Sequence, residues 1–135
     1  MGLKRNRIAL LLNLVFMVAA LVSCGGAKKL EFPQEVPGGW KLRTKQQLAA
    51  LNAPQSIQAH GLVSWWQAEY SGASDPTVYL YEMKTSADAF ELVQKNRASP
   101  GLIAMNFDRF FVVMQTARGT LPDLNRFATA FEKAF

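Results

Sequence analysis

Cys24 and His60 are the only cysteine and the only histidine of the 135-residue chain. An intrachain disulfide needs two cysteines, and a zinc site of the Cys/His type needs several such residues, so the counts exclude both. Nucleophilic catalysis by a thiolate would have to use Cys24. The chemistry open to the chain therefore depends on what surrounds these two residues.

His60 lies between Ala59 and Gly61, just before a predicted strand. An imidazole titrates near neutral pH, so His60 is the natural candidate for a general base. The chain lacks a Gly-x-Ser-x-Gly sequence, which marks the nucleophile of many serine hydrolases. By elimination, the candidate nucleophiles are Ser64, Ser71 and Ser74. An envelope hydrolase or transferase that uses His60 with a nearby carboxylate is therefore the alternative function.

Glu69 and Glu82 are a second candidate for acid–base chemistry, because they lie on the two strands of a predicted hairpin. Two carboxyl groups that face each other raise one of the two pKa values, as in a general acid. The length of the loop does not fix the register, so two separately solvated acids near a cation such as Lys84 are the competing interpretation. Metal-ligand spacing, a phosphate-binding loop and a dinucleotide fingerprint are all missing, and we expect no cofactor.

The first 23 residues have the zones of an export signal. Lys4, Arg5 and Arg7 form a positive region, an apolar run covers 8–22, and small residues follow. The apolar run is shorter than the ~20 residues that a membrane-spanning helix needs. Residues 1–23 are therefore predicted to be a signal peptide.

The sequence Leu21-Val22-Ser23-Cys24 resembles the lipobox of bacterial lipoproteins. The resemblance implies that Cys24 carries a diacylglycerol, that the signal is cut before it, and that its new amine is often acylated. Two or three acyl chains hold a protein on a membrane far more firmly than one. Gly25 in place of the aspartate typical of inner-membrane retention implies an outer-membrane location if the host has two membranes, and the cell membrane otherwise.

The charge of the mature chain argues against a polyanion as partner. Removing residues 1–23 removes three basic residues and no acidic one, so the formal charge falls from +5 to +2. The RNA-binding RNP1 pattern is also missing, and nucleic acid is not expected as a partner. Glycines, prolines and lysines dominate 25–39, so we expect a lipidated tether over 24–39 and a single domain over 40–135.

Within the domain, a short helix is predicted over 42–51, because apolar residues lie on nearby turns and Pro54 follows. Two β-favouring runs, 62–70 and 77–84, flank a cluster of turn residues and predict a hairpin. Thr85 and Asp88 have the spacing of a capping box before a helix over 86–97.

The second half of the domain repeats this order. Strands are predicted over 102–105 and 110–116, and a helix with Thr120 as N-cap follows, with apolar residues at helical spacing from Leu124 to Phe135. The predicted fold is α+β: an antiparallel sheet of about four strands in ββα-ββα order, with both helices on one face and the short helix preceding it.

Adjacent strand residues point to opposite faces, so Trp65-Trp66 and Phe110-Phe111 place aromatic rings on both faces of the sheet. One face must meet the two helices. The other, carrying one residue of each pair, is covered by the helix at 42–51, dimerises, or binds a partner or ligand. Trp65, Trp66, Phe110 and Phe111 are thus the candidate binding face.

The mature chain also resembles a family of uncharacterised bacterial lipoprotein domains. The resemblance rests on Trp40, Gly61, Tyr70, Tyr81-Glu82-Met83, Ala89-Phe90 and Phe111-Val112-Val113. It supports the domain boundaries and implies no activity. The sequence favours a non-enzymatic envelope lipoprotein, anchored through Cys24, that binds an envelope protein, a second copy of itself or an apolar ligand.

Overall fold

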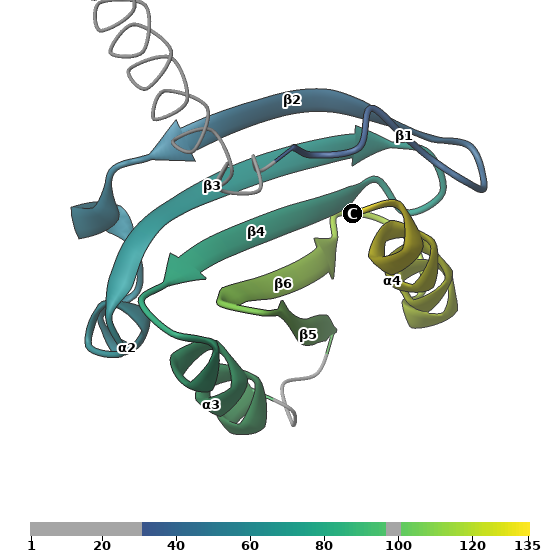
Figure 1. Cartoon of the computed structure of the whole chain (residues 1–135). Coiled ribbons are helices and arrows are strands. Elements are labelled where there is room, and N and C mark those ends of the chain that lie inside the picture. Colours follow the sequence, from purple (N-terminus) through teal and green to yellow (C-terminus); the bar gives the residue numbers. More distant parts are fainter. Residues whose placement is uncertain (1–30, 97–100) are drawn as a thin grey trace, which may run out of the picture. The chain divides into compact units, whose positions relative to one another are not determined.

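An antiparallel sheet of six strands is the scaffold of the fold, with the strands in the order β1-β2-β3-β4-β6-β5 (Figure 1). The computed structural model describes residues 31–96 and 101–135, of which Phe32–Phe135 belong to one compact unit. The α+β class and the antiparallel sheet agree with the prediction, while the strand number is six instead of about four. The strands are β1 (Glu35–Val36), β2 (Trp40–Leu48), β3 (Leu62–Ser71), β4 (Pro76–Met83), β5 (Leu102–Phe107) and β6 (Phe110–Thr116).

The two predicted hairpins form. β3 pairs with β4 across a four-residue loop, and β5 pairs with β6 across Asp108 and Arg109. Asp108 has a φ of 49°, which suits a tight two-residue turn. β4 then pairs with β6 and joins the two hairpins into one sheet.

The helix predicted over 42–51 is wrong, because this segment forms β2 followed by a short 3-10 helix, η2 (Ala50–Asn52). The pairing of β2 with β3 shifts between Leu42 and Thr44, which is the mark of a β-bulge. The bulge interrupts the alternation expected of a strand. In addition, most of β2 is exposed and polar, as befits a strand near the edge of a sheet.

Residues 32–39, which the sequence assigns to the tether, pair and pack with the sheet. Phe32 and Val36 are buried, and the Tyr70 hydroxyl donates to the carbonyl of Pro33 at 2.9 Å. The amide of Leu42 donates to the carbonyl of Gln34 at 2.9 Å. Two apolar residues among glycines and prolines are too weak a pattern to predict a two-residue strand from sequence.

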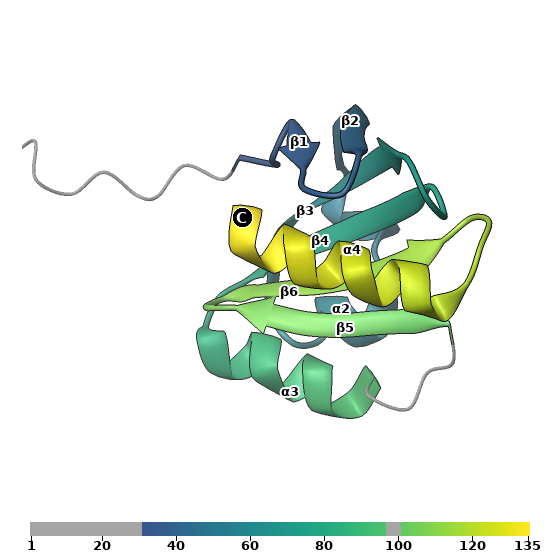
Figure 2. The same ribbon diagram turned by 90° about the vertical axis from the view of Figure 1, so that its right-hand side faces the viewer.

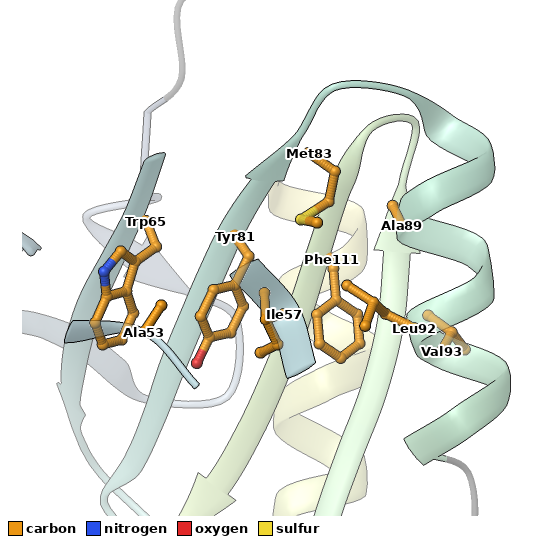
Figure 3. Close-up of a cluster of buried hydrophobic side chains, with 9 residues drawn as sticks. All are labelled: Ala53, Ile57, Trp65, Tyr81, Met83, Ala89, Leu92, Val93 and Phe111. Atoms are coloured by element: carbon orange, nitrogen blue, oxygen red, sulfur yellow. The ribbon is translucent and has the colours of Figure 1, made fainter. Parts of the chain in front are cut away.

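The two long helices lie on opposite faces of the sheet, so the prediction that both cover one face is wrong. α3 (Ser86–Asn96) packs Ala89, Leu92 and Val93 against the face that carries Trp65, Tyr81 and Phe111, hereafter the α3 face. α4 (Leu121–Ala134) packs Phe127 and Phe131 against Tyr70, and Phe131 against Phe107, on the other face, hereafter the α4 face. Figure 2 shows α4 lying across the strands, and Figure 3 shows it behind them when the α3 face is viewed.

Both helices begin where the sequence predicts. Asp88 donates its amide to the Thr85 hydroxyl at 3.1 Å, and that hydroxyl donates to the Asp88 carboxylate at 2.7 Å. Thr120 is the N-cap of α4, with Pro122 in the first turn, and its hydroxyl donates to the Asp123 carboxylate at 3.2 Å. A four-residue helix, α2 (Gln55–Gln58), precedes β3.

The signal peptide, the lipobox and Cys24 lie outside the described residues. Within 31–96 and 101–135, no helix has the length and apolar character that a membrane crossing requires.

Candidate functional site

The α3 face of the sheet holds Trp65 and Phe111 in the core. Trp65 stacks on Tyr81 with ring centroids 5.3 Å apart and an interplanar angle of 6°, and Tyr81 stacks on Phe111 at 5.7 Å (Figure 3). The indole Nε1 of Trp65 donates to the carbonyl of Ala49 at 2.8 Å. With 7% and 0% of their surfaces exposed, Trp65 and Phe111 have little area to offer a partner.

The α4 face carries the other member of each aromatic pair. Trp66 and Phe110 are chain neighbours of Trp65 and Phe111, so their side chains point to the opposite face, the α4 face. There Trp66 lies opposite Leu80 of β4, and Phe110 lies opposite Glu82. Both are only partly buried. The structure thus separates the four predicted binding-face residues into two core residues and two partly exposed ones. α4, and not the helix expected at 42–51, covers part of the second face.

A polar cluster adjoins Trp66 and Phe110, because Ser64 is two residues before Trp66 on β3 and Glu82 lies opposite both Ser64 and Phe110. The Ser64 hydroxyl donates to Oε2 of Glu82 at 2.7 Å, and a guanidinium nitrogen of Arg109 lies 3.1 Å from Oε1 of the same carboxylate. The Arg109 guanidinium carbon also lies 5.5 Å from the centroid of the Phe110 ring, within cation–π range. We call Trp66, Phe110, Ser64, Glu82 and Arg109 the Trp66–Arg109 patch.

Arg109 is the most accessible charged group of this patch. Its side chain is 43% exposed, against 21% for Glu82. Its Nε is buried and has no hydrogen-bond partner among the residues that the structure describes. An arginine held by a carboxylate and an aromatic ring presents a guanidinium of fixed orientation, and guanidinium groups recognise carboxylates and aromatic faces at protein interfaces.

Glu69 and Glu82 do not face each other, so the predicted carboxylate pair is wrong. Glu69 lies opposite Thr77 and Glu82 lies opposite Ser64, on different faces of the sheet. Glu69 accepts from Arg43 at 3.1 Å and from Thr44 at 3.3 Å. Each carboxylate therefore has its own cation. The register of β3 against β4, which decides whether the two acids face each other, could not be derived from sequence.

His60 follows α2 and contacts α3. Its Nδ1 lies 2.8 Å from the carbonyl of Ser56, so Nδ1 carries the proton and donates, which leaves Nε2 to accept from the Lys95 ammonium at 2.9 Å. A carboxylate oxygen of Glu91 is 3.8 Å from Nε2, beyond hydrogen-bond distance.

The three candidate nucleophiles lie elsewhere in the hydrogen-bond network. Ser64 donates to Glu82, Ser71 to the carbonyl of Lys41, and Ser74 to Asp123. The hydrogen bonds of the described residues thus bring none of these three hydroxyl groups to the imidazole of His60. In this part of the chain there is also no group of three His, Cys, Asp or Glu side chains that could hold a metal ion.

A groove runs between α4 and the turn that joins β1 to β2. Its volume is about 410 Å³, and it is lined by Pro37, Asn125, Arg126, Thr129, Ala130 and Lys133. A hollow of about 360 Å³, formed by residues 35–41, adjoins it and shares Pro37. This groove was not predicted from the sequence, although Arg126, Thr129, Ala130 and Lys133 have the i, i+3, i+4, i+7 spacing of one helix face.

Comparison with known proteins gives no relative from which a function could be transferred: no protein-family model, no curated protein and no solved structure matches the chain.

Proposed function

We propose that the chain is a lipid-anchored protein of the bacterial envelope whose domain binds another envelope protein through the Trp66–Arg109 patch. The observation that carries the binding role is the patch itself, in which the partly exposed Trp66 and Phe110 share a sheet face with Glu82 and its ion-pair partner Arg109. Tryptophan and arginine are enriched among the residues that contribute most to binding at protein interfaces.

The anchor is supported by the sequence Leu21-Val22-Ser23-Cys24 after a positive and an apolar zone. Lipidation at Cys24 places the domain at a membrane surface, where a partner in the same envelope meets it at high effective concentration. A small binding patch is sufficient under these conditions, because the tether reduces the entropy that association costs.

The anchor is tested by replacing Cys24 with alanine in cells fed an alkyne-tagged fatty acid. We expect the wild-type chain to carry the tag and to fractionate with membranes, and Cys24→Ala to carry no tag and to keep its signal peptide. Equal labelling of the two chains would refute lipidation at this residue.

The binding role is tested by placing a photo-crosslinking amino acid at position 66 or 110 in the full-length chain and irradiating living cells. The matched control is position 90, because Phe90 is also aromatic, is 51% exposed and lies on α3. We expect positions 66 and 110 to crosslink to one defined protein and position 90 not to. Absence of such a product, or the same products from position 90, would contradict the proposal.

A further inference from the structure

We propose that the groove between α4 and the β1–β2 turn binds the headgroup of an anionic phospholipid in the membrane that holds Cys24. The inference rests on the proposed lipid anchor. It assigns a role to residues that take no part in the Trp66–Arg109 patch, namely Arg126 and Lys133 of α4, with Pro37 opposite them.

The position of the groove relative to the anchor follows from where the folded unit begins. The unit starts at Phe32, and the hydrogen bonds at Pro33 and Gln34 fix the chain just after it. Eight residues, 24–31, precede Phe32, so Cys24 lies at most about 29 Å from it along an extended chain. Pro37 is five residues after Phe32 and lies within about 18 Å of it.

This reach is comparable to the size of the domain itself, since a folded unit of about 100 residues has a radius of gyration of ~13 Å. The lipid anchor therefore keeps the surface around Phe32 close to the bilayer. α4 contacts β1, the first strand after the anchor, so the groove belongs to this surface (Figure 2).

The chemistry of the groove matches a phosphate group beside glycerol and acyl carbons. Arg126 and Lys133 lie two helical turns apart on the same side of α4, and the residues that line the groove include no acidic one. Ala130 and Pro37 add apolar surface between the two cations. Arginine and lysine close to an anionic leaflet bind its headgroups electrostatically.

The two cations are not equally free to bind. Arg126 contacts the carboxylate of Asp123 one turn earlier, so part of its charge is already neutralised. Among the described residues, Lys133 takes part in none of the ion pairs. Lys133 is therefore the residue whose charge decides the interaction with phosphate.

The test uses the full-length lipidated chain reconstituted into vesicles. A fluorophore is attached to Thr129→Cys in the groove or, as a control, to Gln94→Cys on α3. The introduced thiol is then the only free one, because Cys24 is the only native cysteine and is modified. Quenching by a lipid with a spin-labelled headgroup is measured in phosphatidylcholine vesicles with and without phosphatidylglycerol.

We expect several-fold stronger quenching at position 129 than at position 94, an increase with phosphatidylglycerol, and loss of that increase in Lys133→Glu but not in the matched variant Lys84→Glu. Equal quenching at the two positions, or no dependence on the anionic lipid, would overturn the groove assignment while leaving the anchor intact. A chain whose mass shows no lipid at Cys24 would instead refute the anchor.

Discussion

The indole of Trp40 packs edge-on against the ring of Phe127, with centroids 5.3 Å apart and an interplanar angle of 74°. Trp40 begins β2 and Phe127 lies in α4, so this contact joins the start of the fold to its last helix. The indole Nε1 also donates to the carbonyl of Ala73 at 2.9 Å, which ties the β3–β4 loop to the same point. Trp40 is 4% exposed, and through Phe127 its indole joins the aromatic core between the sheet and α4.

Two glycines leave the space that this indole fills, and replacing either should destabilise the domain. A Cβ at Gly38 would lie 2.3 Å from the Trp40 ring and one at Gly72 would lie 2.5 Å from it, and both glycines have positive φ. We expect Gly38→Ala and Gly72→Ala each to cost about 2–4 kcal/mol of unfolding free energy, measured by urea denaturation.

Gly39→Ala is the matched control. Gly39 also has positive φ, but a Cβ there meets no atom within 4 Å, so only the backbone strain of about 1–2 kcal/mol applies. In a Trp40→Leu background, where the smaller side chain leaves room for a Cβ at position 72, Gly72→Ala should cost less unfolding free energy than it does in the wild type. An equal loss of unfolding free energy for all three glycine variants would show that contact with Trp40 does not contribute to the destabilisation.

The parts of the fold that could be predicted from sequence are those with a strong local pattern. Each hairpin has β-favouring runs around turn residues, and each long helix has a threonine at its start and an aspartate three residues later. These signals are carried by neighbours in sequence. The strand β2 and the two-residue strand β1 have no such pattern, because their pairing is set by β3 and by the Tyr70 and Trp40 side chains.

The assignment of each helix to a face depends on long-range topology. β4 pairs with β6 rather than with β5, and α3 and α4 then pack on opposite faces. The alternation in Trp65-Trp66 and Phe110-Phe111 could be predicted from sequence, but which member is buried could not. The Ser64–Glu82 hydrogen bond could not be predicted from sequence either, because it depends on the register of β3 against β4.

The two adjacent tryptophans should differ sharply in their contribution to stability. Trp65 is buried, stacks on Tyr81 and donates to Ala49, whereas Trp66 is partly exposed on the α4 face. We expect Trp65→Ala to cost about 3–5 kcal/mol and Trp66→Ala about 1–2 kcal/mol. Urea denaturation of both variants checks this difference, and the reverse order would mean that the two faces are misassigned.

Alkaline pH should destabilise the domain through Tyr81. Burial, with a smaller contribution from neighbouring Tyr79, raises the pKa of Tyr81 from 10.0 to about 12. Because the pKa is higher in the folded state, the unfolded chain loses this proton first. The contribution of Tyr81 to stability is complete below about pH 10 and is lost as the pH rises toward 12.

Tyr81→Phe isolates this effect, since every other ionisable group is common to both proteins. We expect the unfolding free energy of wild type, measured relative to that of Tyr81→Phe, to fall between about pH 10 and pH 12. A difference that stays constant over this range would show that the Tyr81 hydroxyl titrates normally in the folded domain.

Acid should weaken the first turn of α4 through Asp123. Hydrogen bonds from Arg126 and Thr120, a smaller charge effect of Arg126 and a bond from Ser74 hold the pKa of the Asp123 carboxyl below its usual value, against a weaker opposing effect of burial. The folded state thus binds the proton less readily than the unfolded chain. The stabilisation that the Asp123 carboxylate provides is present above its pKa in the unfolded chain, about 3.9, and is lost as the pH falls below that value.

Asp123→Asn removes this titration, so the unfolding free energy of wild type should exceed that of Asp123→Asn near neutral pH, and the difference should shrink below about pH 4. In an Arg126→Gln background the same substitution should have a smaller effect, because the first of the hydrogen bonds that hold the carboxylate is already gone. Thermal denaturation of the four proteins at both pH values measures the coupling. A difference independent of pH would mean that Asp123 acts on α4 as a polar side chain alone, without the charge that Arg126 and Thr120 bind.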